Sequence, residues 1–306
     1  WMGCIFSFLC SLTSFGIGNM TQVNAVSGAA LAAFGVPLWV TGILVAVLLA
    51  LVVFGGLRRI ASVNEVIIPF ISIAYIICSI TVLIRNRFYL SSAFALIFQG
   101  AFRPAGVAGG ALGYGVSTAM RYGIARGVFT NEAGLGSAPI AHASADCKSP
   151  AHQGVWGIFE VFLDTIVVCT LTALVLLTAQ GGSLWQSGLD GVALTSAAFA
   201  SVFGPKGAGF IAVAVMCFAV AGMLGWCFYG ETAIRFLTGD SNSAIQLYRC
   251  LFLACAVVGA VSEMRTLWEL ADALNAMMAI PNVAAMILLH RHIQVPGKKS
   301  IASPPR

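Results

Sequence analysis

Charged side chains are scarce in this sequence. Only 9% of its 306 residues are Asp, Glu, Lys or Arg, whereas 59% are hydrophobic, and the mean hydropathy is +0.94. A soluble globular domain carries about 25% charged residues, so a water-soluble fold of this length would lack the polar surface that it needs. The composition therefore excludes an ordinary soluble domain and predicts a membrane protein.

Polar interruptions are also few, and the apolar runs between them approach the roughly 20 residues that cross a hydrocarbon core. Backbone groups in lipid must bond within their own segment, which favours helix, whereas barrel strands alternate over about 10 residues. We predict an all-α polytopic membrane protein whose transmembrane domain covers residues 1–289. About eight transmembrane helices are expected, at 1–33, 37–54, 66–84, a broken region at 106–145, 154–178, 210–237, 247–261 and 267–289, with short helices at 90–102 and 194–202.

The two ends of the chain lack familiar signals. No basic region or small-residue cleavage site precedes the first apolar run, which already includes Trp1, so a signal peptide is not indicated. We expect a fragment whose beginning is missing. Residues 290–306 are polar, basic and rich in proline, and they predict a disordered cytoplasmic tail.

Basic residues are unequally divided between the loops on the two sides of the predicted membrane domain. Lys and Arg concentrate in cytoplasmic loops, so the richer side predicts a cytoplasmic C-terminus. The richer side holds Arg58, Arg59, Lys148, Arg235, Arg249, Arg291, Lys298, Lys299 and Arg306, and the other side holds Arg85, Arg87, Arg103, Lys206 and Arg265.

Several functional signatures are missing. No basic run is longer than Arg58-Arg59 or Lys298-Lys299, so the net charge of +5 does not indicate nucleic-acid binding. The nine cysteines include no CxxC pair and lie mostly in apolar runs, so we interpret them as packing residues. There is no Walker loop, no dinucleotide fingerprint and no metal-ligand spacing, and one loosely placed His142 is weak support for a hydrolase. We predict neither an enzyme nor a bound cofactor.

The most informative polar interruption covers residues 126–140. Gly134 and Gly136 free the backbone from helical geometry, and Pro139 suits the first turn of a new helix. A helix broken over 130–136 would present free carbonyls and free N–H groups, which bind a cation and a carboxylate in secondary transporters. The alternative is a glycine-rich loop at the membrane interface.

Acidic residues inside the predicted membrane domain are functional hypotheses by default. Glu132 lies in the predicted break. Glu160 and Asp164 are separated by four positions, so they share one face of a helix and suggest a lumen or a cation path. The alternative for this pair is structural pairing with Arg121 or Arg126.

Two further stretches carry candidate pocket residues. Asn19 and Gln22 are three positions apart and could line a substrate from one helix face, or could form interhelical hydrogen bonds instead. Gly222 and Gly225 would admit a neighbouring backbone. Trp226 would form the wall of an apolar pocket, or would join an interfacial aromatic belt.

Three polar residues lie in the last predicted span, close to Pro281: Asp272, Asn275 and Asn282. Polar side chains in membrane helices commonly form hydrogen bonds between helices. We interpret these three residues as structural rather than as ligand contacts.

Five motifs occur together along nearly the whole chain. They are FGIGNM at 15–20, GGLRRI at 55–60, RYGIARGVFTNEAGLGSAPIA at 121–141, LGW and YGE at 224–231, and MAIPN at 278–282. With these motifs the chain resembles the alanine/glycine:cation symporters, which are bacterial inner-membrane transporters. The third motif is the most specific of the five because it is long.

The resemblance implies the LeuT-like fold, which has two inverted repeats of five helices, with one extra N-terminal helix. The first span then corresponds to the third helix of the first repeat. The break at 130–136 lies in the first helix of the second repeat. Its inverted partner, which supplies the main substrate and sodium contacts in the family, would be absent from this N-terminally truncated chain.

The resemblance also implies a function and a set of site residues. The expected function is sodium-coupled symport of a small neutral amino acid, L-alanine or glycine, across the bacterial inner membrane by alternating access. Sodium is the co-transported ion and the lipid bilayer is the surrounding medium. Gly222 stands where a small polar residue that helps to hold sodium is expected. The substrate-binding residues implied are Phe129, Thr130, Asn131, Gly134, Trp226, Asn19 and Gln22.

Three other functions stay open. A passive channel can use the same broken helix and polar groups. A truncated product of a carrier gene would not transport. A carrier of another small solute would differ only in details of the pocket that the sequence does not specify.

Overall fold

The computed structural model describes residues 1–102, 111–147 and 149–290, and every regular element within these residues is a helix. Six helical segments are long and apolar enough to cross a membrane: Met2–Phe34, Arg59–Arg85, Pro150–Gly182, Pro205–Thr238, Asn242–Val261 and Met264–Leu289. The prediction of an all-α polytopic membrane protein is therefore confirmed.

These six segments match six of the eight predicted spans. Of the other two, one is the 16-residue helix α3 (Leu38–Val53) and the other is the broken region of α6 (Ala111–Thr130) and α7 (Ala138–Ala143). The predicted short helices correspond to α5 (Leu90–Phe102) and α10 (Gly191–Phe203). Apart from His290, the predicted tail at 290–306 lies outside the described residues.

Glycine and proline set several of the helix boundaries. Helix α2 (Thr21–Phe34) ends at Gly35, whose φ of +68° belongs to the left-handed region that glycine adopts without strain. Helix α11 (Pro205–Thr238) begins with Pro205, where the missing N–H has no helical partner, and ends at Gly239 with φ +62°. Helix α4 (Leu57–Arg85) starts nine residues before the predicted Val66, because the polar residues that precede Val66 continue the helix.

Two spans contain π-helical turns, in which each N–H bonds five residues back. The segment η1 (Gly16–Met20) joins α1 (Met2–Phe15) to α2, and η3 (Phe162–Cys169) joins α8 (Pro150–Val161) to α9 (Thr170–Thr178). Such turns widen a helix and often occur at functional sites. The first of them coincides with the small and polar stretch that interrupts the first apolar run.

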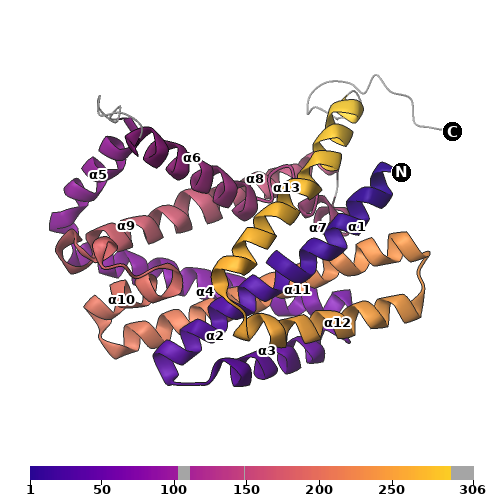
Figure 1. Cartoon of the computed structure of the whole chain (residues 1–306), viewed down its shortest axis with the longest axis horizontal. Helices are drawn as coiled ribbons and strands as arrows, with labels where there is room; N and C mark the ends of the chain where they lie inside the picture. The colour runs from indigo at the N-terminus through magenta and orange to yellow at the C-terminus, as the bar shows by residue number, and fades with distance from the viewer. Residues whose placement is uncertain (103–110, 148, 291–306) are drawn as a thin grey trace.

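Helix α11 is the central element. In Figure 1 it lies beside α1 in the middle of the molecule, with α3 and α12 (Asn242–Val261) along one edge and α5, α6 and α8 along the other. It contributes residues to three buried clusters. Met223 packs with α2, α3 and α12, Trp226 packs with α1 and α13 (Met264–Leu289), and Ile211 packs with α4, α9 and α10.

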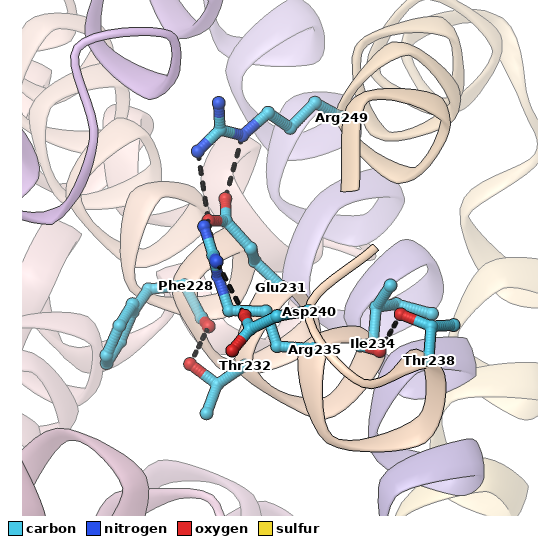
Figure 2. A network of polar contacts seen from close by, with 8 residues as sticks. All are labelled: Phe228, Glu231, Thr232, Ile234, Arg235, Thr238, Asp240 and Arg249. Atoms are coloured by element: carbon cyan, nitrogen blue, oxygen red, sulfur yellow. Dashed lines mark hydrogen bonds and ion pairs between the residues drawn. The ribbon is translucent and has the colours of Figure 1, made fainter. Parts of the chain in front are cut away.

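A buried ion pair joins α11 to α12 (Figure 2). The Nε and Nη2 atoms of Arg249 donate to the two carboxylate oxygens of Glu231 at 2.8 and 2.9 Å, and Arg235 donates to Glu231 and Asp240. The assignment of Arg249 to a cytoplasmic loop is wrong, because it lies inside α12 with only 8% of its surface exposed. The counter-charge of Glu231 lets this arginine be buried.

Candidate functional site

The predicted break is confirmed between α6 and α7. Helix α6 ends at Thr130 and α7 begins at Ala138. Between them Glu132, Gly134 and Gly136 adopt positive φ angles of 48°, 75° and 86°. Two of these three left-handed positions are occupied by glycine, the residue that takes such angles without steric cost. Since α7 has only six residues and ends two residues before the predicted end of the broken region, its dipole is weaker than that of a longer helix.

The break is held by contacts with α13 and α1. The Nδ2 atom of Asn282 donates to the carbonyl oxygen of Gly134 at 3.0 Å. A Cβ atom added to Gly136 would lie 2.7 Å from Asn282 and from Phe6, so only glycine fits there. Asn282 therefore has the structural role that the sequence predicted.

Glu132 and Ser137 close the loop between the two helices. The Ser137 hydroxyl, which is fully buried, donates to a carboxylate oxygen of Glu132 at 2.7 Å. Leu135 lies between them in sequence and is also fully buried. The carboxylate is thus fixed at the point where the helix is interrupted.

Asn131, a predicted substrate ligand, is tied to the neighbouring π-helical turn. Its Oδ1 atom accepts a hydrogen bond from the Thr165 hydroxyl in η3. The adjacent Thr130 is exposed. The break and the turn are therefore joined through a hydrogen bond between side chains.

Trp226 and Phe129 belong to the same apolar cluster, although they are 97 positions apart in the sequence. The indole of Trp226 is 5% exposed and packs directly on Gly18, where an added Cβ would lie 2.4 Å from that of the tryptophan. Its ring stands edge-on to Tyr229 at a centroid distance of 5.5 Å. Because Trp226 is buried within the protein, it does not belong to an interfacial belt.

Phe129 also contacts Trp268 of α13. The two rings are edge-on with centroids 5.9 Å apart, and the guanidinium of Arg126 lies 3.9 Å from the centroid of the same indole. Arg126 in turn forms a bidentate ion pair with Asp272 at 2.9 and 3.1 Å. The alternative in which Arg126 neutralises Glu160 and Asp164 is therefore wrong, because a residue of α13 takes that place.

The amides of the first span are used for helix packing. Asn19 is fully buried and donates from Nδ2 to the Phe252 carbonyl at 2.5 Å, while its Oδ1 has no partner among the described residues. Asn24 donates to the Gly259 and Ser262 carbonyls. Gln22 is half-buried. The interhelical alternative thus holds for Asn19.

Gly222 and Gly225 do not admit a neighbouring backbone, so that prediction is wrong. No atom of the described residues lies within 4 Å of where a Cβ on either glycine would sit. The close approaches occur instead at Gly18 and at Gly230, whose added Cβ would lie 2.0 Å from the Tyr248 hydroxyl. The glycines face different sides of their helices, and sequence alone does not indicate which side another element covers.

Two residues of this region were not predicted, Trp268 and Thr165. Each lies more than 30 positions from its partner in the break, so no local spacing links them to it. The sequence offers one signal for Trp268, an indole beside the acidic Glu269 near the start of the last span. Within the described part of the chain, no three His, Cys, Asp or Glu residues are close enough to hold a metal ion.

Residues 1–298 match the sodium:alanine symporter family. The chain is 40% identical over 290 residues to a sodium/alanine symporter of Methanococcus maripaludis, which covers 94% of this chain and 62% of that protein. It is 39% identical over 292 residues to a probable sodium/glutamine symporter of Bacillus subtilis, covering 95% and 59%. An uncharacterized transporter of Haemophilus influenzae is 39% identical over 295 residues, covering 96% and 64%. The chain thus spans about three fifths of the length of these relatives.

Proposed function

This chain belongs to the sodium:alanine symporter family, and we propose that it forms the substrate-binding part of a sodium-coupled symporter for a small neutral amino acid. The members of this family are transporters. The family resemblance and the prediction that the chain is not an enzyme are therefore both confirmed. The proposed substrate is L-alanine or glycine, carried across the bacterial inner membrane with sodium as the co-transported ion. The C-terminus is proposed to be cytoplasmic.

The observation that carries the proposal is the meeting of a broken helix with two aromatic walls. Phe129, one residue before the end of α6, and Trp226 of α11 share one buried cluster. A pocket between two such rings fits a small side chain and excludes a large one by overlap. In this proposal Thr130, Asn131 and Gly134 supply the polar contacts at the break.

The packing of the helices supports a LeuT-like fold of inverted repeats. If the first span is the third helix of one repeat and α6–α7 begin the other, then α11 is the counterpart of α1–α2, and α12 is the counterpart of α3. Each of these helices packs against its proposed counterpart. A two-fold axis within the membrane plane brings counterparts together in this way.

Sodium and substrate would bind near the midplane and stabilise each other's sites, because coupling between two ligands is reciprocal. In this proposal Gly222 lies near the sodium site, and Asn19 and Gln22 approach the substrate from the first repeat. The hydrogen bond of Asn19 to the Phe252 carbonyl of α12 favours a supporting role for this residue. Alternating access then requires α6–α9 to move against the body that α11 organises.

The experiment is uptake of labelled L-alanine into proteoliposomes with and without an inward sodium gradient. It compares this chain with a chimera that adds the portion of the Methanococcus maripaludis relative that the chain does not span. Saturable uptake that depends on sodium, in the chimera or in both, is the expected result. Uptake without saturation or sodium dependence would indicate a channel. If neither protein takes up alanine in a saturable, sodium-dependent way, the proposal is refuted.

Replacement of Trp226 tests the pocket itself. In the chimera, Trp226→Ala is expected to let larger amino acids such as leucine compete with alanine, because a wall of the pocket is removed. Trp156→Ala in α8, where the indole is exposed, is the matched control and should leave selectivity unchanged. Unchanged competition by leucine in the Trp226 variant would show that this indole does not contact the substrate.

A further inference from the structure

A cavity of about 1240 Å³ lies between α2, α6, α13 and the start of α10. It is at the end of α13 remote from the C-terminus, since Met264 and Trp268 are among its lining residues. Its walls carry charges of both signs, from Arg121, Arg126, Asp190, Glu263, Arg265, Glu269 and Asp272. Phe129 lies behind Trp268, so one aromatic layer separates this cavity from the proposed pocket.

Arg126 already holds a carboxylate in this cavity. Its Nη1 and Nη2 atoms donate to Oδ1 and Oδ2 of Asp272 at 2.9 and 3.1 Å. This fork geometry is the one with which arginine binds any carboxylate, including that of a free amino acid. The site is therefore built for the chemistry of such a ligand.

The pair of Arg126 and Asp272 is more exposed to water than the pair that joins α11 to α12. The side chains of Arg126 and Asp272 are 34% and 35% exposed, compared with 10% and 12% for the buried pair of Arg249 and Glu231. Water competes for half-exposed charges, so their mutual attraction is weak. The guanidinium of Arg126 also lies over the ring of Trp268, 3.9 Å from its centroid, and this contact does not depend on the carboxylate.

We propose that this cavity is an access site for a zwitterionic amino acid, which binds its α-carboxylate to Arg126 and its α-ammonium to Asp272. One ion pair within the protein is replaced by two between protein and ligand, and the charges remain balanced. A simple anion or cation would leave Asp272 or Arg126 without a counter-charge. The inference rests on the proposed function for the identity of the ligand.

From this site the amino acid would move toward the proposed pocket, and Trp268 would couple the two. This indole contacts both Arg126 and Phe129. A ligand that draws Arg126 away from Asp272 also loosens the ring that covers Phe129. Arg265 and Glu269 line the same cavity and form their own exposed pair at 3.1 Å, which makes them suitable controls.

The first test needs no transport. Ala125 lines the cavity one position before Arg126, and Ala125→Cys supplies a reporter. Alkylation of this cysteine is measured in lipid nanodiscs without sodium, against the same chain without the added cysteine. L-alanine is expected to slow alkylation at least threefold, whereas propionate and alaninamide, each lacking one of the two charges, should not. Equal protection by either analogue, protection by sodium chloride alone, or no protection by alanine would overturn the inference.

The second test replaces the two charged groups in the Ala125→Cys background. Arg126→Lys keeps the charge but loses the fork, and Asp272→Asn keeps the shape but loses the charge. Each should raise the alanine concentration for half-protection about tenfold, and Glu269→Gln should change it less than twofold. An unchanged value in both variants, or an equal change in the Glu269 control, would overturn the inference.

The two proposals fail in different ways. If the chimera transports alanine with sodium but the reporter is never protected, the proposed function stands and the access site does not exist. If neither protein takes up alanine in the proteoliposome assay but the cysteine is protected by zwitterions, the site stands and the proposed transport fails.

Discussion

The body, which is α11 with the helices α1, α2, α3 and α12 that pack on it, differs in construction from the broken region around α6 and α7. In the body, 56% of the most apolar 18-residue stretch of Met2–Phe34 is buried inside the protein. The corresponding stretch of α11 is buried to the same extent, 56%. In the segment that follows the break, Pro150–Gly182, the share is 17%. The body is joined by a buried bidentate ion pair, whereas the break is joined by single hydrogen bonds and a half-exposed ion pair.

The difference indicates which part can move. Regions with few buried contacts open at low free energy, and transporters draw their mobile elements from such regions. The break also contains the residues proposed to bind substrate, so binding and movement would be coupled locally. The body would then serve as the fixed reference, with α11 as its axis.

Neutralising Glu231 should have the largest effect on stability. Glu231→Gln leaves Arg249 buried without a counter-charge, and the free energy of unfolding should fall by about 3–5 kcal/mol. Asp272→Asn makes the same change at the half-exposed pair and should cost less than about 1 kcal/mol. Both are measured by unfolding in detergent micelles. Equal losses would mean that the two regions do not differ in the way described.

A double replacement separates charge from packing at the same place. In Glu231→Leu with Arg249→Met, no charge of the pair remains buried, so most of the lost stability should return. A double variant no better than Glu231→Gln would show that the pair stabilises the body by more than its charge balance.

Close packing in the body gives the next prediction. Gly230→Ala would place a Cβ 2.0 Å from the Tyr248 hydroxyl and 2.5 Å from that of Ser14, two groups that share a hydrogen bond of 2.8 Å. Overpacking of this kind costs about 1–3 kcal/mol. Gly225→Ala, on the same helix with open space at its Cβ, should change stability by less than about 1 kcal/mol. A Gly225 variant as damaged as the Gly230 variant would contradict the packing.

The sequence predicted the elements better than their contacts. The break at 130–136 follows from Gly134, Gly136 and Pro139, whose backbone preferences act locally. The short helix α5 was predicted at its observed bounds, because its apolar run has clear ends. Local preference and hydropathy therefore predict where the helices lie, although a helix such as α4 can begin nine residues before its predicted start.

Contacts between distant segments could not be predicted in the same way. Arg249 was assigned to a loop because a charge inside an apolar run is costly, and its partner Glu231 is 18 positions away on another helix. The glycines that admit close neighbours were also misassigned. Hydropathy gives the depth of a residue in the membrane, but it does not give its direction around the helix axis.

The smallest expected effect concerns substrate uptake, and it compares Asn131 in the break with Asn275 in α13. Asn131→Ala removes the side chain that joins the break to η3 and is proposed to contact the amino acid. The value of kcat/KM for alanine should therefore fall about tenfold, which corresponds to a loss of about 1.4 kcal/mol. Asn275→Ala, on the buried face of α13, should reduce it less than threefold. Both are measured as sodium-dependent uptake by the chimera. Equal kinetics for the two variants would remove the functional distinction between the regions.

Thr165→Val then decides how Asn131 acts. If the amide contacts substrate directly, losing the Thr165 hydroxyl frees Asn131 without removing it, and uptake should fall much less than in Asn131→Ala. If the amide acts by holding η3 against the break, Thr165→Val should reproduce the whole loss, and the double variant should be no worse than either single one. Additive losses would indicate two separate roles, one at the substrate and one at the joint between the break and the π-helical turn.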